Sequence, residues 1–259
     1  MATYKKRGYK PKPIKEKGEK IDVLEQDSTT AEVFNTLDES ANKAEDWVAK
    51  NQKGIFVVVG LAALIVLGYL GYNKYIAEPK AEEAMNEMYT AQKYFDEAVN
   101  AATGKDSLYN LALKGGEGKF GMVEIADQYS GTPAGNLANY YAGMAYLNTK
   151  DYTNAVKYLS GFSSDDNALS PIAKGGLGDA FVQLEQLPEA LEYYEQAIKA
   201  AGDNSYTAPL YLFKAANVAQ TLGNSEKALE YYKRIKSDFS LSDQATNIET
   251  FIGRAEASK

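Results

Sequence analysis

The residue types that this chain lacks remove most catalytic chemistry. The sequence contains no cysteine and no histidine among its 259 residues. Thiolate nucleophiles, Ser-His-Asp relays, disulfide frameworks and Cys/His zinc sites are therefore excluded. An enzyme built from this chain would depend on Asp, Glu, Lys, Tyr or Ser, without the side chain most often used as general base. The composition favours binding over catalysis, and we expect no cofactor and no metal.

Three short motifs resemble ligand sites but lack the context that such sites need. Residues 116–121 spell G-x-G-x-x-G, yet a dinucleotide fold needs a second strand after the helix and an acidic residue about twenty positions on. The run Asp165-Asp166-Asn167 lacks the glycine and distal glutamate of a calcium loop, so it predicts a solvated turn. Glu82 and Glu83 are adjacent in a predicted helix and point apart. A membrane enzyme using carboxylates alone is the most remote alternative.

One apolar run dominates the N-terminal third. Gly54–Asn73 are 20 consecutive uncharged residues between Lys53 and Lys74. At about 1.5 Å per residue the run covers roughly 30 Å, the thickness of a bilayer core, and it predicts a transmembrane helix over residues 54–76. A buried core helix rarely runs this far without a charge. A cleaved signal peptide is disfavoured because 53 residues precede the run and no small-x-small cleavage site follows it.

The charge distribution predicts the orientation of this helix. Residues 1–53 contain 11 Lys/Arg, eight of them in the first twenty. The positive-inside rule then places residues 1–53 in the cytoplasm and residues 77–259 outside the inner membrane. After the span, 17 Lys/Arg stand against 25 Asp/Glu, so this domain should repel nucleic acid. The basic tail is predicted to be disordered, either as a topology signal or in contact with anionic lipid or the ribosome.

A helix is also predicted between the tail and the span. Thr29 and Glu32 have the spacing of a capping box. Apolar residues then recur every three or four positions, which indicates an amphipathic juxtamembrane helix. They are Val33, Leu37, Ala41, Ala44 and Val48. This helix would lie on the membrane surface or dock on another membrane protein.

Helical periodicity continues beyond the span. Glu78-Pro79 should interrupt or bend the helix, because proline lacks an amide proton and clashes with the preceding turn. A long helix follows, and its apolar stripe predicts packing along its length. The stripe consists of Ala81, Ala84, Met85, Met88, Ala91, Phe95, Ala98, Val99 and Ala102. The glycine-rich stretch 104–118 is predicted to be a loop, and the remainder is predicted to be helical without a sheet.

The second half contains an internal repeat. Pro133, Pro171 and Pro209 fall 38 residues apart, and Thr132 and Ser170 precede the first two, as expected for a cap followed by proline at the first helical position. Second helices are predicted from Asp151, Leu187 and Ser225. In each, a small residue is followed four positions on by a larger one: Ala155 by Leu159, Ala190 by Tyr194, and Ala228 by Tyr232. The expected repeats cover about 80–130, 133–168, 171–204 and 209–238, with a capping helix at 242–257.

These positions resemble the tetratricopeptide repeat family. The best copy supplies Leu177, Gly178, Phe181, Ala190, Tyr194 and Ala197 at the family's characteristic positions. The aromatic residue expected at position four is replaced by Asn139, Lys174 and Leu212, so the repeats are divergent. The resemblance implies an all-α protein, in which a single N-terminal transmembrane helix precedes an α-solenoid of divergent helical hairpins.

The resemblance also implies a concave groove lined by the first helix of each repeat. The candidate partner-binding residues are Tyr140, Met144, Asn148, Asp179, Gln183, Phe213, Asn217 and Gln220. An aromatic and amide lining suits an extended segment or a partner helix. It lacks the Lys/Arg/Asn set with which family members hold a terminal carboxylate. The alternative is that these side chains only pack the next repeat.

The layout and residues 136–156, NLANYYAGMAYLNTKDYTNAV, are similar to the YfgM-type ancillary subunits of the bacterial Sec translocon, in a Bacteroidetes-like form. This resemblance implies a non-enzymatic scaffold beside the Sec channel, with translocon subunits and a periplasmic chaperone as partners. The alternative is a periplasmic holdase that binds unfolded clients directly through Tyr140, Met144 and Phe213.

Overall fold

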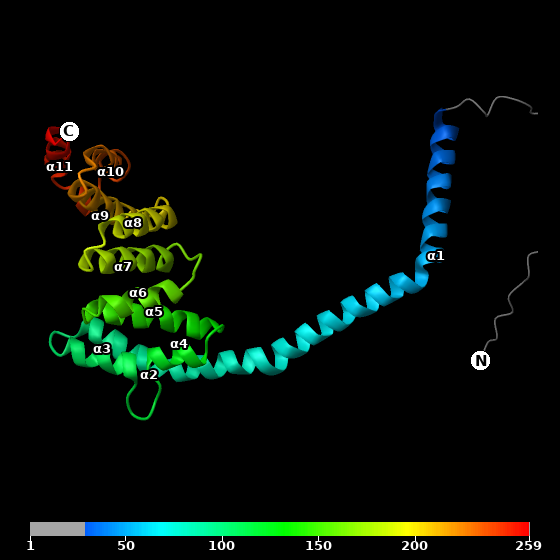
Figure 1. Cartoon of the computed structure of the whole chain (residues 1–259), viewed down its shortest axis with the longest axis horizontal. Coiled ribbons are helices and arrows are strands. Elements are labelled where there is room, and N and C mark those ends of the chain that lie inside the picture. Colours follow the sequence, from blue (N-terminus) through cyan, green and yellow to red (C-terminus); the bar gives the residue numbers. More distant parts are fainter. Residues whose placement is uncertain (1–28, 259) are drawn as a thin grey trace, which may run out of the picture. The chain divides into compact units, whose positions relative to one another are not determined.

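Helix-forming periodicity is realised throughout the described chain. The computed structural model describes residues 29–258, and over this range the chain is helical and contains no strand. The predicted basic tail and the side chains of the predicted capping box, Thr29 and Glu32, lie outside the described part. The chain divides into two units, Met1–Gly68 and Tyr69–Lys259. Figure 1 shows the helices of the second unit, from α2 to α11, stacked in chain order.

The described part of the first unit consists of one helix, α1 (Thr29–Tyr72), whose last four residues belong to the second unit. The helical stretch Thr36–Asn100 contains an 18-residue window with a mean hydropathy of 2.5, none of which is buried. Within the described residues it is the one helix long and apolar enough to cross a membrane. Its large side chains are exposed, including Phe56, Leu64 and Ile65.

Just before Pro79, where an interruption or a bend is predicted, the regular α-helix gives way to a π-helix. A π-helix, η1 (Asn73–Ala77), leads directly into α2 (Glu78–Asn100), so the chain stays helical. Proline removes one amide donor and crowds the carbonyl four residues earlier. The wider π turn accommodates this junction, because the Glu78 N–H donates to the Asn73 carbonyl oxygen five residues back.

α2, α3 (Lys105–Lys114) and α4 (Met122–Gln128) share one core with α5. From the predicted stripe of α2, Ala84, Met88, Ala91, Phe95 and Ala98 are buried, whereas Met85 and Val99 are exposed.

The predicted loop over 104–118 is wrong, because most of it forms α3. Tyr109, Ala112 and Leu113 supply a buried helical face there. The glycines lie at the two ends of this helix and do not interrupt it. Gly104 and Gly115 have φ of 73° and 87°, values that residues with side chains rarely adopt.

Three helical hairpins follow. They are α5 (Pro133–Asn148) with α6 (Tyr152–Gly161), α7 (Leu169–Gln183) with α8 (Leu187–Ala201), and α9 (Thr207–Thr221) with α10 (Ser225–Asp238). The second helices lie where the repeat predicts them. At the first hairpin, Thr132 caps α5 by accepting a hydrogen bond from the Gly135 N–H at 3.0 Å.

The other two prolines do not open their helices. α7 and α9 begin two residues earlier, at Leu169 and Thr207. Ser170 is therefore inside α7, and the helix start is held by Asp166 Oδ1, which accepts from the N–H groups of Ala168 and Leu169 at 2.8 Å. Asn204 does the same before α9. These Asx turns decide the start because a side-chain oxygen two or three residues upstream reaches the first free amides.

Small residues allow the hairpin helices to approach closely. Ala155, Ala190 and Ala228 are fully buried. A Cβ at Gly143 would lie 2.5 Å from the Leu159 side chain, and one at Gly178 would lie 2.5 Å from the Tyr194 ring. The array ends with a 3₁₀ turn, η2 (Asp243–Ala245), and α11 (Ile248–Ala257), whose Ile248, Ile252 and Ala255 join the last core.

Candidate functional site

Two of the predicted groove residues are exposed at the ends of first helices. Asn148 ends α5, and Gln183 ends α7. The Asn148 Nδ2 donates to the Met144 carbonyl oxygen at 2.8 Å, within its own helix. Their amide groups are accessible to a partner without any rearrangement of the core.

Tyr140 and Met144 are half-buried on α5. The Tyr140 ring lies 5.5 Å from the Tyr141 ring and 5.3 Å from the Phe162 ring, centroid to centroid. Burial raises the pKa of the Tyr140 phenol above its ordinary value. Met144 packs against both the first core and the small cluster around Leu159. Both side chains therefore join neighbouring helices and present only part of their surface.

Asp179 on α7 is the centre of a polar cluster that crosses two repeats. It accepts from the Lys214 Nζ at 2.6 Å and from the Tyr194 hydroxyl at 2.7 Å. The Lys214 Nζ also lies 5.9 Å from the ring centroids of Tyr194 and Tyr211, at the outer limit of a cation–π contact. Burial, with the nearby Asp179 charge, raises the pKa of both phenols. Asp179 thus holds α7, α8 and α9 together.

The third repeat uses its groove residues in the same way. The Phe213 ring is 4.9 Å from the Phe251 ring of α11. Asn217 Oδ1 accepts from the Tyr232 hydroxyl at 2.7 Å. The Gln220 Nε2 donates to Ser225 Oγ at 3.2 Å, while its buried Oε1 has no partner among the described residues. α11 therefore covers this end of the predicted groove.

All eight candidates lie on α5, α7 and α9. Some of them contact residues that the sequence pattern does not single out. The missed residues are Lys214 and Tyr211, which complete the Asp179 cluster. Their signal in the sequence is positional: Asp179 precedes Tyr194 by 15 residues, as Asn217 precedes Tyr232. This equal spacing is consistent with a hydrogen bond from the second helix to the first helix of the same hairpin. It would have indicated an internal role for Asp179 and Asn217.

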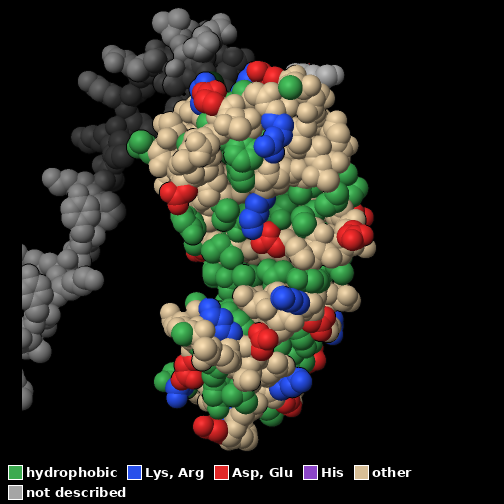
Figure 2. All heavy atoms as spheres, turned by 90° about the vertical axis from the view of Figure 1, so that its left-hand side faces the viewer, with side chains coloured by type: hydrophobic (Ala, Val, Ile, Leu, Met, Phe, Trp, Pro, Cys, Tyr) green, Lys and Arg blue, Asp and Glu red, His purple; other side chains and the backbone are tan. Residues whose placement is uncertain are grey.

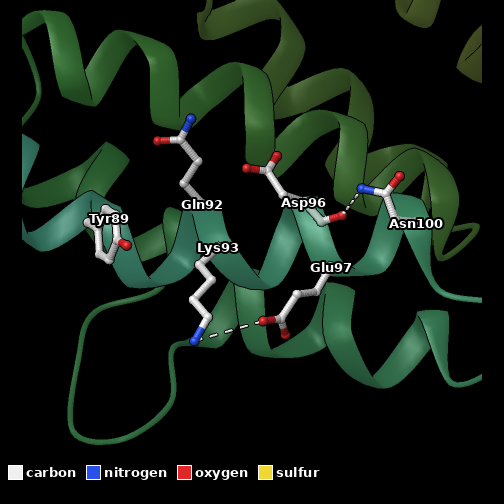
Figure 3. A pocket seen from close by; sticks show the side chains of 6 residues that line it. All are labelled: Tyr89, Gln92, Lys93, Asp96, Glu97 and Asn100. Carbon is white, nitrogen blue, oxygen red and sulfur yellow. Dashed lines mark hydrogen bonds and ion pairs between the residues drawn. The ribbon is translucent and has the colours of Figure 1, made fainter.

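Cavities elsewhere lie along α2. Figure 3 shows one of about 480 Å³, with Gln92 and Asp96 on one side of the helix and Lys93 and Glu97 on the other. Lys93 and Glu97 form an ion pair at 3.9 Å. A second cavity of about 440 Å³ lies between α2 and the start of α5 and is lined by Ala81, Met85 and Pro133, among others.

The charges of the array are mixed. Figure 2 shows one face of it, where basic and acidic side chains are interspersed and hydrophobic side chains form a band across the middle. Among the described residues, no group of three carboxylates lies close enough to hold a metal ion. Stacked hairpins with such a surface define an all-helical repeat protein of the kind that binds other proteins.

The family of these repeats follows from their sequence. The tetratricopeptide repeat model matches residues 142–205 and 176–242. Residues 142–242 are therefore similar to the tetratricopeptide repeat family, and the described chain is an all-helical repeat protein with repeats of this kind. No curated protein sequence matches the chain.

Two solved structures are similar in part. One is a chain from Podosopora anserina, described as a kinesin light chain with nearly identical TPR-like repeats. It is 14% identical, covers 69% of this chain and 87% of its own, and has a TM-score of 0.48. The other is the MamA protein, which is 18% identical, covers 65% of this chain and 87% of its own, and has a TM-score of 0.40.

Proposed function

We propose that this chain is a single-pass membrane protein whose helical array binds another protein beside the Sec channel. The observation that carries the proposal is the apolar window in the helical stretch Thr36–Asn100, which no part of the described chain covers. Apolar surface of this length and composition is stable in a bilayer core and not in water. An array of tetratricopeptide repeats on the same chain is a module for protein recognition.

The proposed topology follows the charges of the sequence. Residues 1–53 lie in the cytoplasm, residues 54–76 cross the inner membrane, and residues 77–259 lie in the periplasm. The protein acts as a non-enzymatic scaffold. Its proposed partners are Sec translocon subunits and a periplasmic chaperone, so that the array assists secreted proteins as they leave the channel.

A scaffold is favoured over a holdase by the state of the aromatic groove residues. A holdase needs apolar surface that is free to meet unfolded clients. Tyr140 packs against Tyr141 and Phe162, and Phe213 packs against Phe251. The exposed groove positions are instead the amides of Asn148 and Gln183, which recognise a defined partner by hydrogen bonds.

Site-specific photocrosslinking in intact bacterial cells tests this function. A photoreactive residue at Gln183 or Asn148 should crosslink to Sec channel subunits or to a periplasmic chaperone. The matched control is Lys236 on the outer surface of α10, which should give no such product. A further probe near Trp47 reports on the opposite side of the membrane. If the groove positions crosslink to neither partner while the protein is present in the membrane, the Sec assignment is wrong.

A further inference from the structure

The junction between α6 and α7 contains a cleft separate from the predicted groove. Two adjoining cavities, of about 290 and 390 Å³, form it. Both are lined by Ser164, Asp165, Ser170, Lys174 and Gln196. We call this region the α6–α7 cleft. Its size is near the lower end of the range of ligand sites.

The cleft exists because this junction departs from the next one along the array. Lys174 is 38 residues before Leu212, and Ser170 is 38 before Ala208. Leu212 and Ala208 are fully buried and close the junction between α8 and α9. In addition, α6 has 10 residues and α8 has 15. A shorter helix and two polar replacements therefore open at α6–α7 a space that is filled at α8–α9.

The first repeat closes the same position by a different route. Asn139 is 35 residues before Lys174. Its side chain packs against Gly161, where an added Cβ would lie 2.9 Å from the Asn139 Oδ1, and its Nδ2 donates to the Gly135 carbonyl oxygen at 3.2 Å. The Asn139 amide is therefore hydrogen-bonded to its own helix and packed against the second helix of the hairpin. At the equivalent position of the second repeat, Lys174 lines both cavities of the cleft.

The apolar wall of the cleft is held in place by contacts outside it. Phe162 packs on the Tyr140 ring, and Tyr193 stacks on Phe181 with centroids 5.2 Å apart. The loop above the cleft is tied to α5, because Asn136 donates to the Ser163 carbonyl oxygen at 2.8 Å and accepts from the Ser163 N–H at 2.9 Å. A site fixed in this way loses little conformational entropy when it binds.

The polar wall carries an ammonium group, that of Lys174, that forms no ion pair with the carboxylates of the described residues. Lys174 is half-buried and donates to Ser170 Oγ at 3.1 Å, and no carboxylate of the described residues lies within ion-pair distance of it. Asp165 lines both cavities and Asp166 lines one of them; both carboxylates are exposed, as is Lys199. Asp166 Oδ1 is already occupied by the start of α7. A partly desolvated ammonium gains most from a carboxylate brought by a ligand.

We propose that the α6–α7 cleft binds a peptide segment in which a large apolar side chain lies next to a carboxylate. The side chain packs between Phe162, Leu177 and Tyr193. The carboxylate accepts from Lys174 and Ser170, and Gln196 hydrogen-bonds to the peptide backbone. The carboxylate belongs either to the C-terminus of the partner or to an acidic side chain of it. This inference rests on the scaffold function proposed above and names the chemistry of one segment that the array holds.

The test uses the full chain in lipid nanodiscs and fluorescence anisotropy, with empty nanodiscs as the blank. The first probe is fluorescein-labelled Gly-Ser-Gly-Ser-Leu-Phe with a free C-terminal carboxylate. The second is the same peptide with an amidated C-terminus, and the third is amidated Gly-Ser-Gly-Ser-Phe-Asp. Binding of the first probe alone identifies a C-terminal carboxylate, and binding of the third identifies a side-chain carboxylate. The second probe should bind about tenfold or more weakly than the better of the other two.

Substitutions at one residue separate recognition from folding. Lys174→Gln should weaken binding of the carboxylate probe about tenfold or more and leave the circular dichroism spectrum of the helices unchanged. Lys174→Leu imitates Leu212, so it should abolish binding and raise the unfolding midpoint. Lys114→Gln, at an exposed lysine of α3, should change neither. The proposal is overturned if neither carboxylate probe binds, if the amidated control binds equally, or if Lys174→Gln binds like the wild type. Since Gln183 and Asn148 lie outside the cleft, the crosslinking test of the scaffold function keeps its own outcome.

Discussion

α1 and α2 both carry large apolar side chains but differ in what covers them. Along α1, Phe56, Leu64 and Leu67 are 64–67% exposed, whereas Met88 and Phe95 of α2 are at most 9% exposed. α2 is covered by α3, α4 and α5, which share its core. In the described residues no helix covers the apolar window of α1. The sequence of a helix therefore indicates which of its surfaces is apolar. The neighbouring elements decide whether that surface is covered by protein or by another medium.

The largest difference is expected when a large apolar side chain is replaced by alanine in each of the two helices. Met88→Ala should lower the free energy of unfolding of the array by about 2–5 kcal/mol, because it removes buried contacts and leaves a cavity. Leu64→Ala should leave that free energy within about 0.5 kcal/mol, since the Leu64 side chain is 67% exposed. Urea unfolding of both full-length variants in mild detergent measures this. Equal losses would mean that α1 is packed on the array.

A smaller effect is expected inside the array from the Asp179 cluster. Asp179→Ala should cost about 1–2 kcal/mol, because it strands Lys214 and the Tyr194 hydroxyl, although both charged side chains remain about one-third exposed. Glu256→Ala breaks the Lys233–Glu256 ion pair, whose side chains are more than half exposed, and should cost under about 0.5 kcal/mol. Denaturant midpoints of the two variants measure the difference. A reversed order would contradict the assigned role of Asp179.

The smallest expected effect is a pH dependence. Burial raises the pKa of Tyr211 above its ordinary value, so the folded array holds this phenol proton more tightly than the unfolded chain does. The contribution is complete below about pH 10, the ordinary pKa of the phenol in the unfolded chain, and is lost progressively as the pH rises above it. Wild type should therefore lose more stability than Tyr211→Phe between pH 9 and pH 11. Parallel losses would show that Tyr211 ionises freely in the folded state.

Sequence patterns were sufficient for elements with strong periodicity. The second helices from Asp151, Leu187 and Ser225 and the cap at Thr132 are confirmed by the structure. α3 was missed because glycines at 104, 115 and 118 were weighed above a short buried face, whose packing on α2 is a tertiary effect. The starts of α7 and α9 were misplaced because Asx turns at Asp166 and Asn204 act two residues before the prolines.

The candidate site was predictable in position more than in role. The resemblance placed all eight residues on first helices, as the structure does. It could not show that Asp179 meets Lys214, 35 residues away, or that α11 reaches Phe213. Such contacts depend on how far each hairpin is rotated against the next, and no local pattern records that rotation. The α6–α7 cleft could not be predicted from the sequence for the same reason.

The claim on which this account depends is that the uncovered apolar helix is embedded in a lipid bilayer. Alkaline carbonate extraction of membranes from cells that express the full chain tests it most directly. We predict that the protein stays in the membrane pellet, and that insertion of arginine by Leu64→Arg, at a cost of about 2.5–3.5 kcal/mol, moves part of it to the supernatant. Met85→Arg, at an exposed position of α2, should have no such effect. Release of the unaltered protein into the carbonate supernatant would contradict the account.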